Sequence, residues 1–195
     1  MMNAIRAPLV VSLMLIPFVL LSLKSIGYLS GLGANPVEAI IHEMGLWGIR
    51  FLMLTLLITP IAYYSGNRSI AKLGKPVGLM AFFYVLNHFL SYAIIDQAGD
   101  LAVIIVDIIE TPYLIVGWGG FLCLLGVASV SFKRLESWFN QNRPTISGLV
   151  YISTILGVWH FYWQTKVIEV EPLLYSVILL FLIVWRFKIT WGVKK

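Results

Sequence analysis

Residues 46–63 read LWGIRFLMLTLLITPIAY, a run of eighteen residues in which Arg50 is the only charged side chain. A transmembrane helix needs roughly 20 predominantly apolar residues to cross the hydrocarbon core of a bilayer. The run is continuously apolar, whereas a membrane β-strand shows about ten residues that alternate apolar and polar side chains. The stretch therefore predicts a membrane-spanning α-helix.

Five further apolar stretches occur along the chain, and together with the first they predict six spans. The expected spans are residues 9–23, 46–63, 77–95, 113–130, 146–165 and 173–187. At roughly 20 residues each, six helices leave only short loops in a chain of 195 residues. We therefore expect one all-α transmembrane domain over residues 1–195, a polytopic six-helix bundle with no separate soluble domain. No internal repeat is visible.

The overall composition excludes most other protein classes. Hydrophobic residues make up 59% of the chain and charged residues 12%, with a mean hydropathy of +0.89. Soluble domains carry roughly 45–50% apolar and about 25% charged residues, so a soluble globule, a disordered chain and a coiled coil are excluded. Cys123 is the only cysteine, which excludes an internal disulfide framework and any CxxC motif.

The first apolar stretch, residues 9–23, admits two interpretations. Arg6 followed by a short apolar run is also the pattern of a secretory signal peptide. No small-x-small cleavage pattern follows at the right distance. We therefore expect a retained transmembrane helix.

Charged residues divide unequally between the two sides of the expected bundle. The N-terminus, the second and fourth loops and the C-terminus carry eleven cations against one acid, Glu136, and the other three loops carry eight acids against Lys24 and Lys166. The eleven cations are Arg6, Arg68, Lys72, Lys75, Lys133, Arg134, Arg143, Arg186, Lys188, Lys194 and Lys195. Because cytoplasmic loops are enriched in Lys and Arg, we expect both termini in the cytoplasm. The net charge of +5 then reflects topology and contact with anionic membrane lipid rather than nucleic-acid binding.

Two of the three histidines, His88 and His160, fall inside expected spans, where ionisable side chains are costly and mark function by default. At 1.5 Å rise per residue, each lies roughly 7–11 Å from the outer end of its helix. Two imidazoles at matching depth can hold one metal, and haem is a flat apolar ring whose iron takes axial histidines. Hydrogen bonding across the bundle and a proton path remain open as alternatives.

Other polar residues lie near the expected histidine pair. Arg50, near the outer end of the second span, is placed to pair with a haem propionate, and its alternative role is that of a cation reaching the membrane interface. His42 precedes the second span and is interpreted as a structural residue or a residue at the haem edge. Tyr84 and Tyr92 are four residues before and after His88, on the same helix face. The chain contains no HExxH or GxSxG motif, so membrane proteolysis lacks its residues.

Several segments resemble the MsrQ (YedZ) family, with order and spacing maintained over about residues 30–190. They are residues 35–45 (NPVEAIIHEMG), 47–60 (WGIRFLMLTLLITP), 78–92 (GLMAFFYVLNHFLSY), 111–113 (TPY), 149–151 (LVY) and 160–163 (HFYW). The resemblance implies a haem b membrane subunit related to the ferric-reductase transmembrane domain. It also implies that His88 and His160 hold one haem in the outer half of the membrane.

The same resemblance implies a place in an electron-transfer system. Members of the family pass electrons across the bacterial inner membrane to a periplasmic molybdopterin subunit that reduces methionine sulfoxide in proteins. The electrons come from the quinone pool or from a cytoplasmic flavin reductase, and the family is also associated with FMN. Two rival functions are a stand-alone haem-dependent ferric or metal reductase and a membrane scaffold that has lost its cofactor.

One departure from the family pattern concerns the cytoplasmic half of the fifth span. The family has a histidine 13 residues before the second ligand, and this chain has Ser147 there. Serine is a poor axial ligand, and Met80 is the only soft side chain near that end of the third span. We therefore expect no histidine-ligated inner haem, with electrons entering from a quinol or flavin near Arg68, Lys72 and Lys75.

Overall fold

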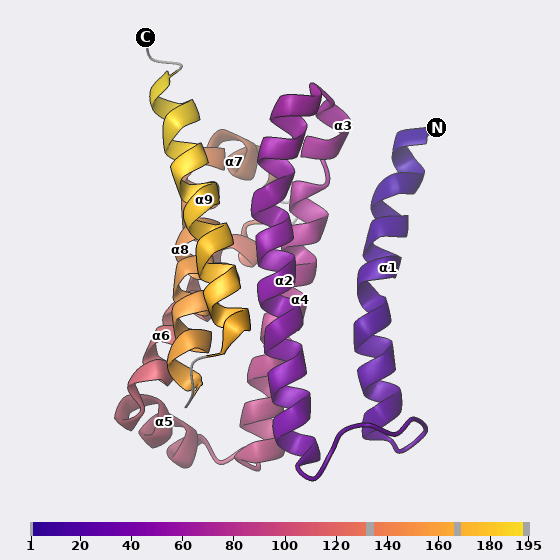
Figure 1. The fold of residues 1–195 in the computed structure, drawn as a ribbon, viewed down its shortest axis with the longest axis vertical. Helices are drawn as coiled ribbons and strands as arrows, with labels where there is room; N and C mark the ends of the chain where they lie inside the picture. Colours follow the sequence, from indigo (N-terminus) through magenta and orange to yellow (C-terminus); the bar gives the residue numbers. More distant parts are fainter. Residues whose placement is uncertain (1, 132–134, 166–168, 193–195) are drawn as a thin grey trace.

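The computed structural model describes residues 2–131, 135–165 and 169–192 (Figure 1). Its elements are the α-helices α1 (Met2–Ser25), α2 (Pro36–Ser65), α3 (Arg68–Ala71), α4 (Gly74–Leu90), α5 (Leu101–Glu110), α6 (Pro112–Ser129), α7 (Glu136–Gln141), α8 (Arg143–Gln164) and α9 (Val170–Gly192), and the π-helix η1 (Ser91–Asp96). The described residues contain no strand. Six stretches of the described residues are long and apolar enough to cross a membrane: Ala7–Ser25, Pro36–Ser65, Arg68–Asp96, Pro112–Ser129, Arg143–Gln164 and Val170–Ile189. The chain is therefore an all-α, multi-pass membrane protein, as expected.

The helices extend beyond the apolar runs that indicate them. Helix α2 begins at Pro36, ten residues before the expected span, because the Asn35 side chain accepts a hydrogen bond from the Glu38 backbone N–H and caps the helix. Helix α5 lies in a segment expected to be a loop, and the Asp100 side chain caps it by accepting from two backbone N–H groups. Hydropathy thus locates the part of a helix that crosses the hydrocarbon core and not the full helix.

The bundle has two chemically different ends. The start of α1, the end of α9 and the short helices α3 and α7 lie at one end, and α5 lies at the other (Figure 1). We call these the basic end and the acidic end, after Arg68, Lys72, Lys75 and Arg143 at the first and Glu38, Asp96, Asp107 and Glu171 at the second. Lys133, Arg134, Lys166, Lys194 and Lys195, which also entered the charge comparison, lie outside the described residues.

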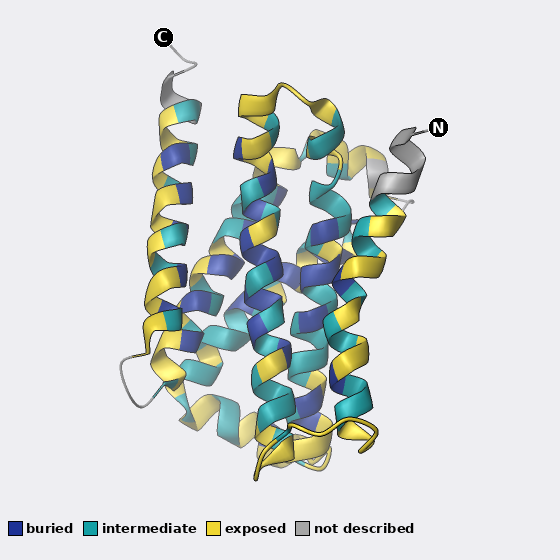
Figure 2. Cartoon of the chain, turned by 45° about the vertical axis from the view of Figure 1, so that its right-hand side comes forward, coloured by how far each residue is buried: buried dark blue, intermediate teal, exposed yellow. Residues whose placement is uncertain are grey.

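Buried residues follow the inward faces of the helices, and exposed residues lie on the outside and at the two ends (Figure 2). The outward faces carry large apolar residues, among them Ile16, Leu122 and Phe181, at 48%, 54% and 67% exposure. In water such a surface would aggregate. In a bilayer it is the surface that contacts lipid.

Helix α1 joins the bundle through Tyr84 on α4. The Tyr84 side chain is fully buried, and its hydroxyl donates to the Met14 carbonyl oxygen (2.7 Å) and accepts from the Phe18 backbone N–H (2.9 Å). These two backbone groups are helical partners four residues apart, so the hydroxyl is inserted into the hydrogen-bond ladder of α1. Tyr84 therefore faces α1 and not the face of α4 that carries His88, where the sequence pattern had placed it.

Helices α2 and α4 form one hairpin, and α6 and α8 form a second that repeats it 72 residues further along the chain. A Cβ on Gly48 would lie 2.8 Å from Val85 Cγ2, and a Cβ on Gly120 would lie 3.7 Å from the backbone nitrogen of Gly157, the position equivalent to Val85. The identical pairs in the packed faces include Gly45/Gly117, Gly48/Gly120, Leu52/Leu124, His88/His160 and Phe89/Phe161. The sequence showed no repeat because most other pairs differ. Parallel repeats of this kind are a known construction of membrane proteins.

Candidate functional site

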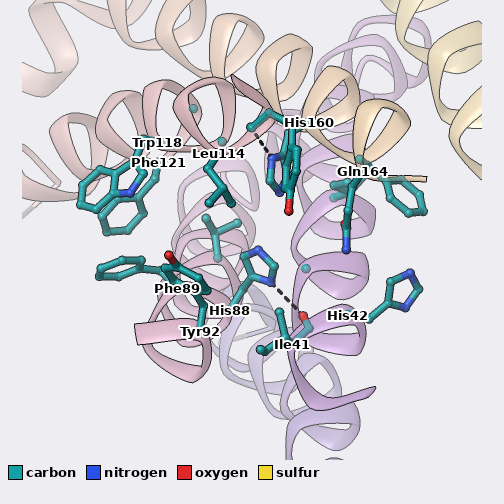
Figure 3. Close-up of a pocket in the computed structure, with 18 of the residues that line it drawn as sticks. Ile41, His42, His88, Phe89, Tyr92, Leu114, Trp118, Phe121, His160 and Gln164 are labelled. Carbon is teal, nitrogen blue, oxygen red and sulfur yellow. Dashed lines mark hydrogen bonds between the residues drawn. The ribbon is translucent and has the colours of Figure 1, made fainter. Parts of the chain in front are cut away.

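A cavity of about 380 Å³ lies between the two hairpins at the acidic end of the bundle (Figure 3). His88 enters it from α4 and His160 from α8, and the two side chains face each other across it (Figure 3). Their ring centroids are 6.2 Å apart, and the ring planes are inclined at 78°. The structure therefore brings together the two histidines that the sequence singled out.

Each imidazole is held by a backbone carbonyl of the partner helix in its own hairpin. His88 Nδ1 is 2.8 Å from the Ile41 carbonyl oxygen, and His160 Nδ1 is 2.7 Å from that of Tyr113. A carbonyl oxygen only accepts, so Nδ1 carries the proton and donates it. In a neutral ring this leaves the lone pair on Nε2, which is the arrangement of a metal-ligating histidine.

Two glycines make room for these rings. A Cβ atom on Gly45 would lie 3.0 Å from His88 Nδ1, and one on Gly117 would lie 2.8 Å from His160 Nδ1. Gly45 follows Ile41 by four residues, and Gly117 follows Tyr113 by four. The carbonyl oxygen that binds each imidazole and the glycine that leaves space for it therefore lie on the same face of the helix, one turn apart. Each histidine thus has the same two contacts in its own hairpin, a carbonyl oxygen and a glycine, and we call the glycine the seat of the histidine.

The separation of the two rings fits a single metal ion between them. A metal–imidazole nitrogen bond is about 2 Å, and the ring centre lies roughly 1 Å behind the nitrogen, so two axial rings have centroids roughly 6 Å apart. The observed 6.2 Å agrees with this arrangement. A pair of neutral imidazoles on one metal is the axial ligand set of many haem proteins.

The cavity walls are apolar and aromatic. Phe89 of α4 packs against Trp118 and Phe121 of α6, with ring centroids 5.0 Å and 5.2 Å apart. Leu114 and Phe161 complete the lining near the histidines. These walls suit a flat apolar ring system whose only strong bonds run to the two Nε2 atoms.

The mouth of the cavity at the acidic end is polar. Tyr92 donates a hydrogen bond of 2.5 Å to Asp107 Oδ2, and Thr111 donates one of 3.1 Å to Asp107 Oδ1. His42 also lines the cavity, with its ring edge-on to Phe161 at 5.8 Å. Among the residues that line the cavity in the described chain, none is lysine or arginine.

Arg50 occupies a different place from the one expected for a propionate partner. Its Nη2 donates to Glu171 (2.9 Å) and its Nε donates to Tyr175 (3.0 Å), so it connects α2 to α9. The guanidinium also lies 4.8 Å from the centre of the Trp47 ring. Arg50 is not among the described residues that line the cavity.

Sequence reasoning missed the carbonyls of Ile41 and Tyr113, the two glycine seats, and the aromatic wall. The signal that identifies the first two is the 72-residue offset, which relates Ile41 to Tyr113 and Gly45 to Gly117. Each carbonyl lies 47 residues before its histidine. An offset this long is visible only when the pairing of the helices is known.

Comparisons with known proteins identify the family of the chain. The family model for the ferric reductase like transmembrane component matches residues 44–165, which contain both histidines and both glycine seats. The protein-methionine-sulfoxide reductase heme-binding subunit MsrQ of Xanthomonas oryzae pv. oryzae is 37% identical over 155 residues, covering 80% of this chain and 71% of that relative. The protein of the same name from Brucella ovis is 35% identical over 161 residues, covering 83% of this chain and 73% of the relative. The chain belongs to the MsrQ family and carries its ferric-reductase-like transmembrane domain.

Proposed function

We propose that the chain is the haem-binding, electron-transferring membrane subunit of a protein-methionine-sulfoxide reductase system, in which His88 and His160 would ligate the haem iron. The observation that carries this proposal is the pair of facing imidazoles, 6.2 Å apart, each with Nδ1 bound to a backbone carbonyl. The names of the relatives, which describe heme-binding subunits, support it.

The cofactor we propose is one haem b per chain. Covalent c-type attachment needs a CxxCH motif, and the sequence has Cys123 as its single cysteine. When bound, haem supplies reversible one-electron transfer at a potential set by its ligands and surroundings. His88 and His160 would hold it between the two hairpins, the Ile41 and Tyr113 carbonyl oxygens would fix the ligand tautomers, and apolar side chains such as Phe89 would surround it. FMN remains a second cofactor candidate on the family resemblance.

We propose that electrons flow from the basic end of the bundle to the acidic end. The cavity opens at the acidic end, which we propose faces the periplasm of a bacterial inner membrane and a molybdopterin reductase subunit. Quinol or a cytoplasmic flavin reductase supplies electrons from the basic end, where we propose that both termini lie. The lysines and arginines of the basic end support this orientation, because cytoplasmic loops are enriched in these residues.

Absorbance spectroscopy of the purified protein tests the ligand assignment. We expect a low-spin, bis-histidine reduced-minus-oxidised spectrum and about one haem per chain by pyridine haemochrome assay. His88→Ala and His160→Ala each abolish or strongly alter the spectrum, whereas the matched control His42→Ala retains most of it. A native spectrum in His88→Ala, or two tightly bound haems per chain, contradicts the proposal.

Two further outcomes distinguish the rival functions. Protein that folds but binds no haem when haem is supplied supports the cofactor-free scaffold. Haem-loaded protein that reduces ferric chelates at full rate in cells lacking any periplasmic reductase subunit supports the stand-alone metal reductase. Under our proposal, electron transfer to protein methionine sulfoxide requires the periplasmic subunit.

A further inference from the structure

A second cavity, of about 580 Å³, lies between the same two hairpins at the basic end of the bundle. Leu52 and Leu124, a pair related by the 72-residue repeat, line both cavities and separate them. Both leucines are almost completely buried, at 2% and 3% exposure. The bundle therefore contains two stacked cavities with a leucine pair between them.

The lining of the second cavity also follows the 72-residue repeat. Position pairs that both line it include Thr55/Val127, Lys75/Ser147, Gly78/Val150 and Leu79/Tyr151. Lys75 and Ser147 each lie 13 residues before a histidine of the first cavity, on α4 and α8. Where the first cavity has two imidazoles, the second thus has an ammonium and a hydroxyl, groups that hydrogen-bond an anion and bind haem iron poorly.

The charge around this cavity has one sign. Arg68, Lys72, Lys75 and Arg143 line it, and none of its described lining residues is Asp or Glu. Arg143 donates to the Asn140 side-chain oxygen (2.8 Å from Nη2), and the Lys75 ammonium lies 5.0 Å from the centre of the Phe139 ring. Both partners are neutral, and within the described part of the chain neither cation contacts a carboxylate.

The other walls are apolar and reach the surface that contacts lipid. Phe82, Val127 and Val150 line the interior, and Leu79 lines the cavity while being 37% exposed. A ligand that suits this cavity therefore has an anionic group for the cations and an apolar body that can extend toward the bilayer. Basic pockets between transmembrane helices commonly bind lipid headgroups.

We propose that the second cavity binds the phosphate headgroup of an anionic phospholipid, with Lys75 and Arg143 as its main contacts. The acyl chains extend past Leu79 into the adjacent membrane leaflet. The site is independent of haem binding, because its lining shares only Leu52 and Leu124 with the first cavity. A soluble phosphate compound is the alternative source of the same anionic group.

Native mass spectrometry of the full-length protein, released from detergent, tests the site. Phosphatidylglycerol and phosphatidylcholine with identical acyl chains are the probes. We expect the wild type to retain one phosphatidylglycerol and little phosphatidylcholine, and the double variant Lys75→Gln/Arg143→Gln to lose retention roughly tenfold or more. The matched control Lys188→Gln, which removes an exposed cation outside the cavity lining, keeps it.

A second variant distinguishes a loss of lipid binding from a loss of folding. Ser147→Phe fills the cavity without removing a charge and should also lower phosphatidylglycerol retention, while the thermal unfolding temperature stays close to that of the wild type. Equal retention in the double variant and the wild type overturns the proposal. Displacement of phosphatidylglycerol by inorganic phosphate or FMN at micromolar concentration also overturns it, because the cavity is then a site for a soluble phosphate compound.

Discussion

Gly117 determines where the His160 ring lies, because any side chain at this position would meet the imidazole. A Cβ would lie 2.8 Å from Nδ1 and 3.0 Å from Cε1, and overpacking of this kind costs about 1–3 kcal/mol. We expect Gly117→Ala to weaken haem binding and to change the low-spin EPR spectrum, which responds to the angle between axial rings. The control Gly126→Ala, on the same helix with nothing within 4 Å, should leave the spectrum unchanged. An unaltered spectrum in Gly117→Ala contradicts the seat assigned to this glycine.

Substitution of Arg50 tests whether the cofactor needs a cation near the acidic end. Its described partners are Glu171 and Tyr175, so Arg50→Met removes a contact between α2 and α9. Because both side chains of the ion pair are about one third exposed, we expect a loss of about 0.2–1 kcal/mol. Thermal unfolding measures this loss, and Glu171→Gln should reproduce it. The haem spectrum should not change; loss of haem from Arg50→Met at an unchanged unfolding temperature would restore the propionate role.

The equivalence of the two hairpins is testable at the scale of the helix pair. Ser153 on α8 donates to the Gly120 carbonyl oxygen of α6 (2.8 Å), and its counterpart in the first hairpin is the fully buried Ala81. Ser153→Ala should lower stability by about 0.6 kcal/mol, a typical value for a hydrogen bond between membrane helices. Ala81→Ser should recover a similar amount by donating to the Gly48 carbonyl oxygen. Thermal unfolding compares the two, and a larger loss in Ala81→Ser than in Ser153→Ala would show that the hairpins pack differently.

The helices that cross the membrane were predictable, and those at its edges were not. Runs of roughly 20 apolar residues are a strong signal, and six of the described stretches are long and apolar enough to span a membrane; only the first, which also fits a signal peptide, admits a second interpretation. Helix α5 is a ten-residue apolar segment, which periodicity and length do not distinguish from a strand or loop. The first turns of α2 carry polar side chains because they lie at the end of the bundle. A prediction based on hydropathy therefore assigns these turns to a loop.

The candidate site was predictable only in its ionisable residues. His88 and His160 stand out because imidazoles in apolar spans are rare, and a common depth suggested that they meet. Their carbonyl and glycine contacts come from other helices and depend on which helices pair. The place of Arg50 likewise depends on α9, from which Glu171 and Tyr175 contact it. Single-sequence patterns contain no signal for such pairings.

Across the whole molecule, the repeated hairpins enclose two cavities, one toward each end of the bundle. The cavity with two imidazoles lies at the acidic end and the cavity with the four cations lies at the basic end. Leu52 and Leu124 form the barrier between them. The two cavities therefore meet at this buried leucine pair.

Reporter fusions test how this whole arrangement sits in the membrane. Six spans put both termini on one side, and the cation bias of eleven to two predicts that this side is the cytoplasm. A fluorescent protein fused after Lys195 should therefore fluoresce, and alkaline phosphatase at the same point should be inactive. Alkaline phosphatase inserted at Gly99, in the turn between η1 and α5, should be active.

The same reporters at Gly66, at the basic end, should match the C-terminal result, because α2 ends there. An active phosphatase after Lys195 would invert the bundle, and the histidine cavity would then open toward the cytoplasm, where it could not serve a periplasmic reductase.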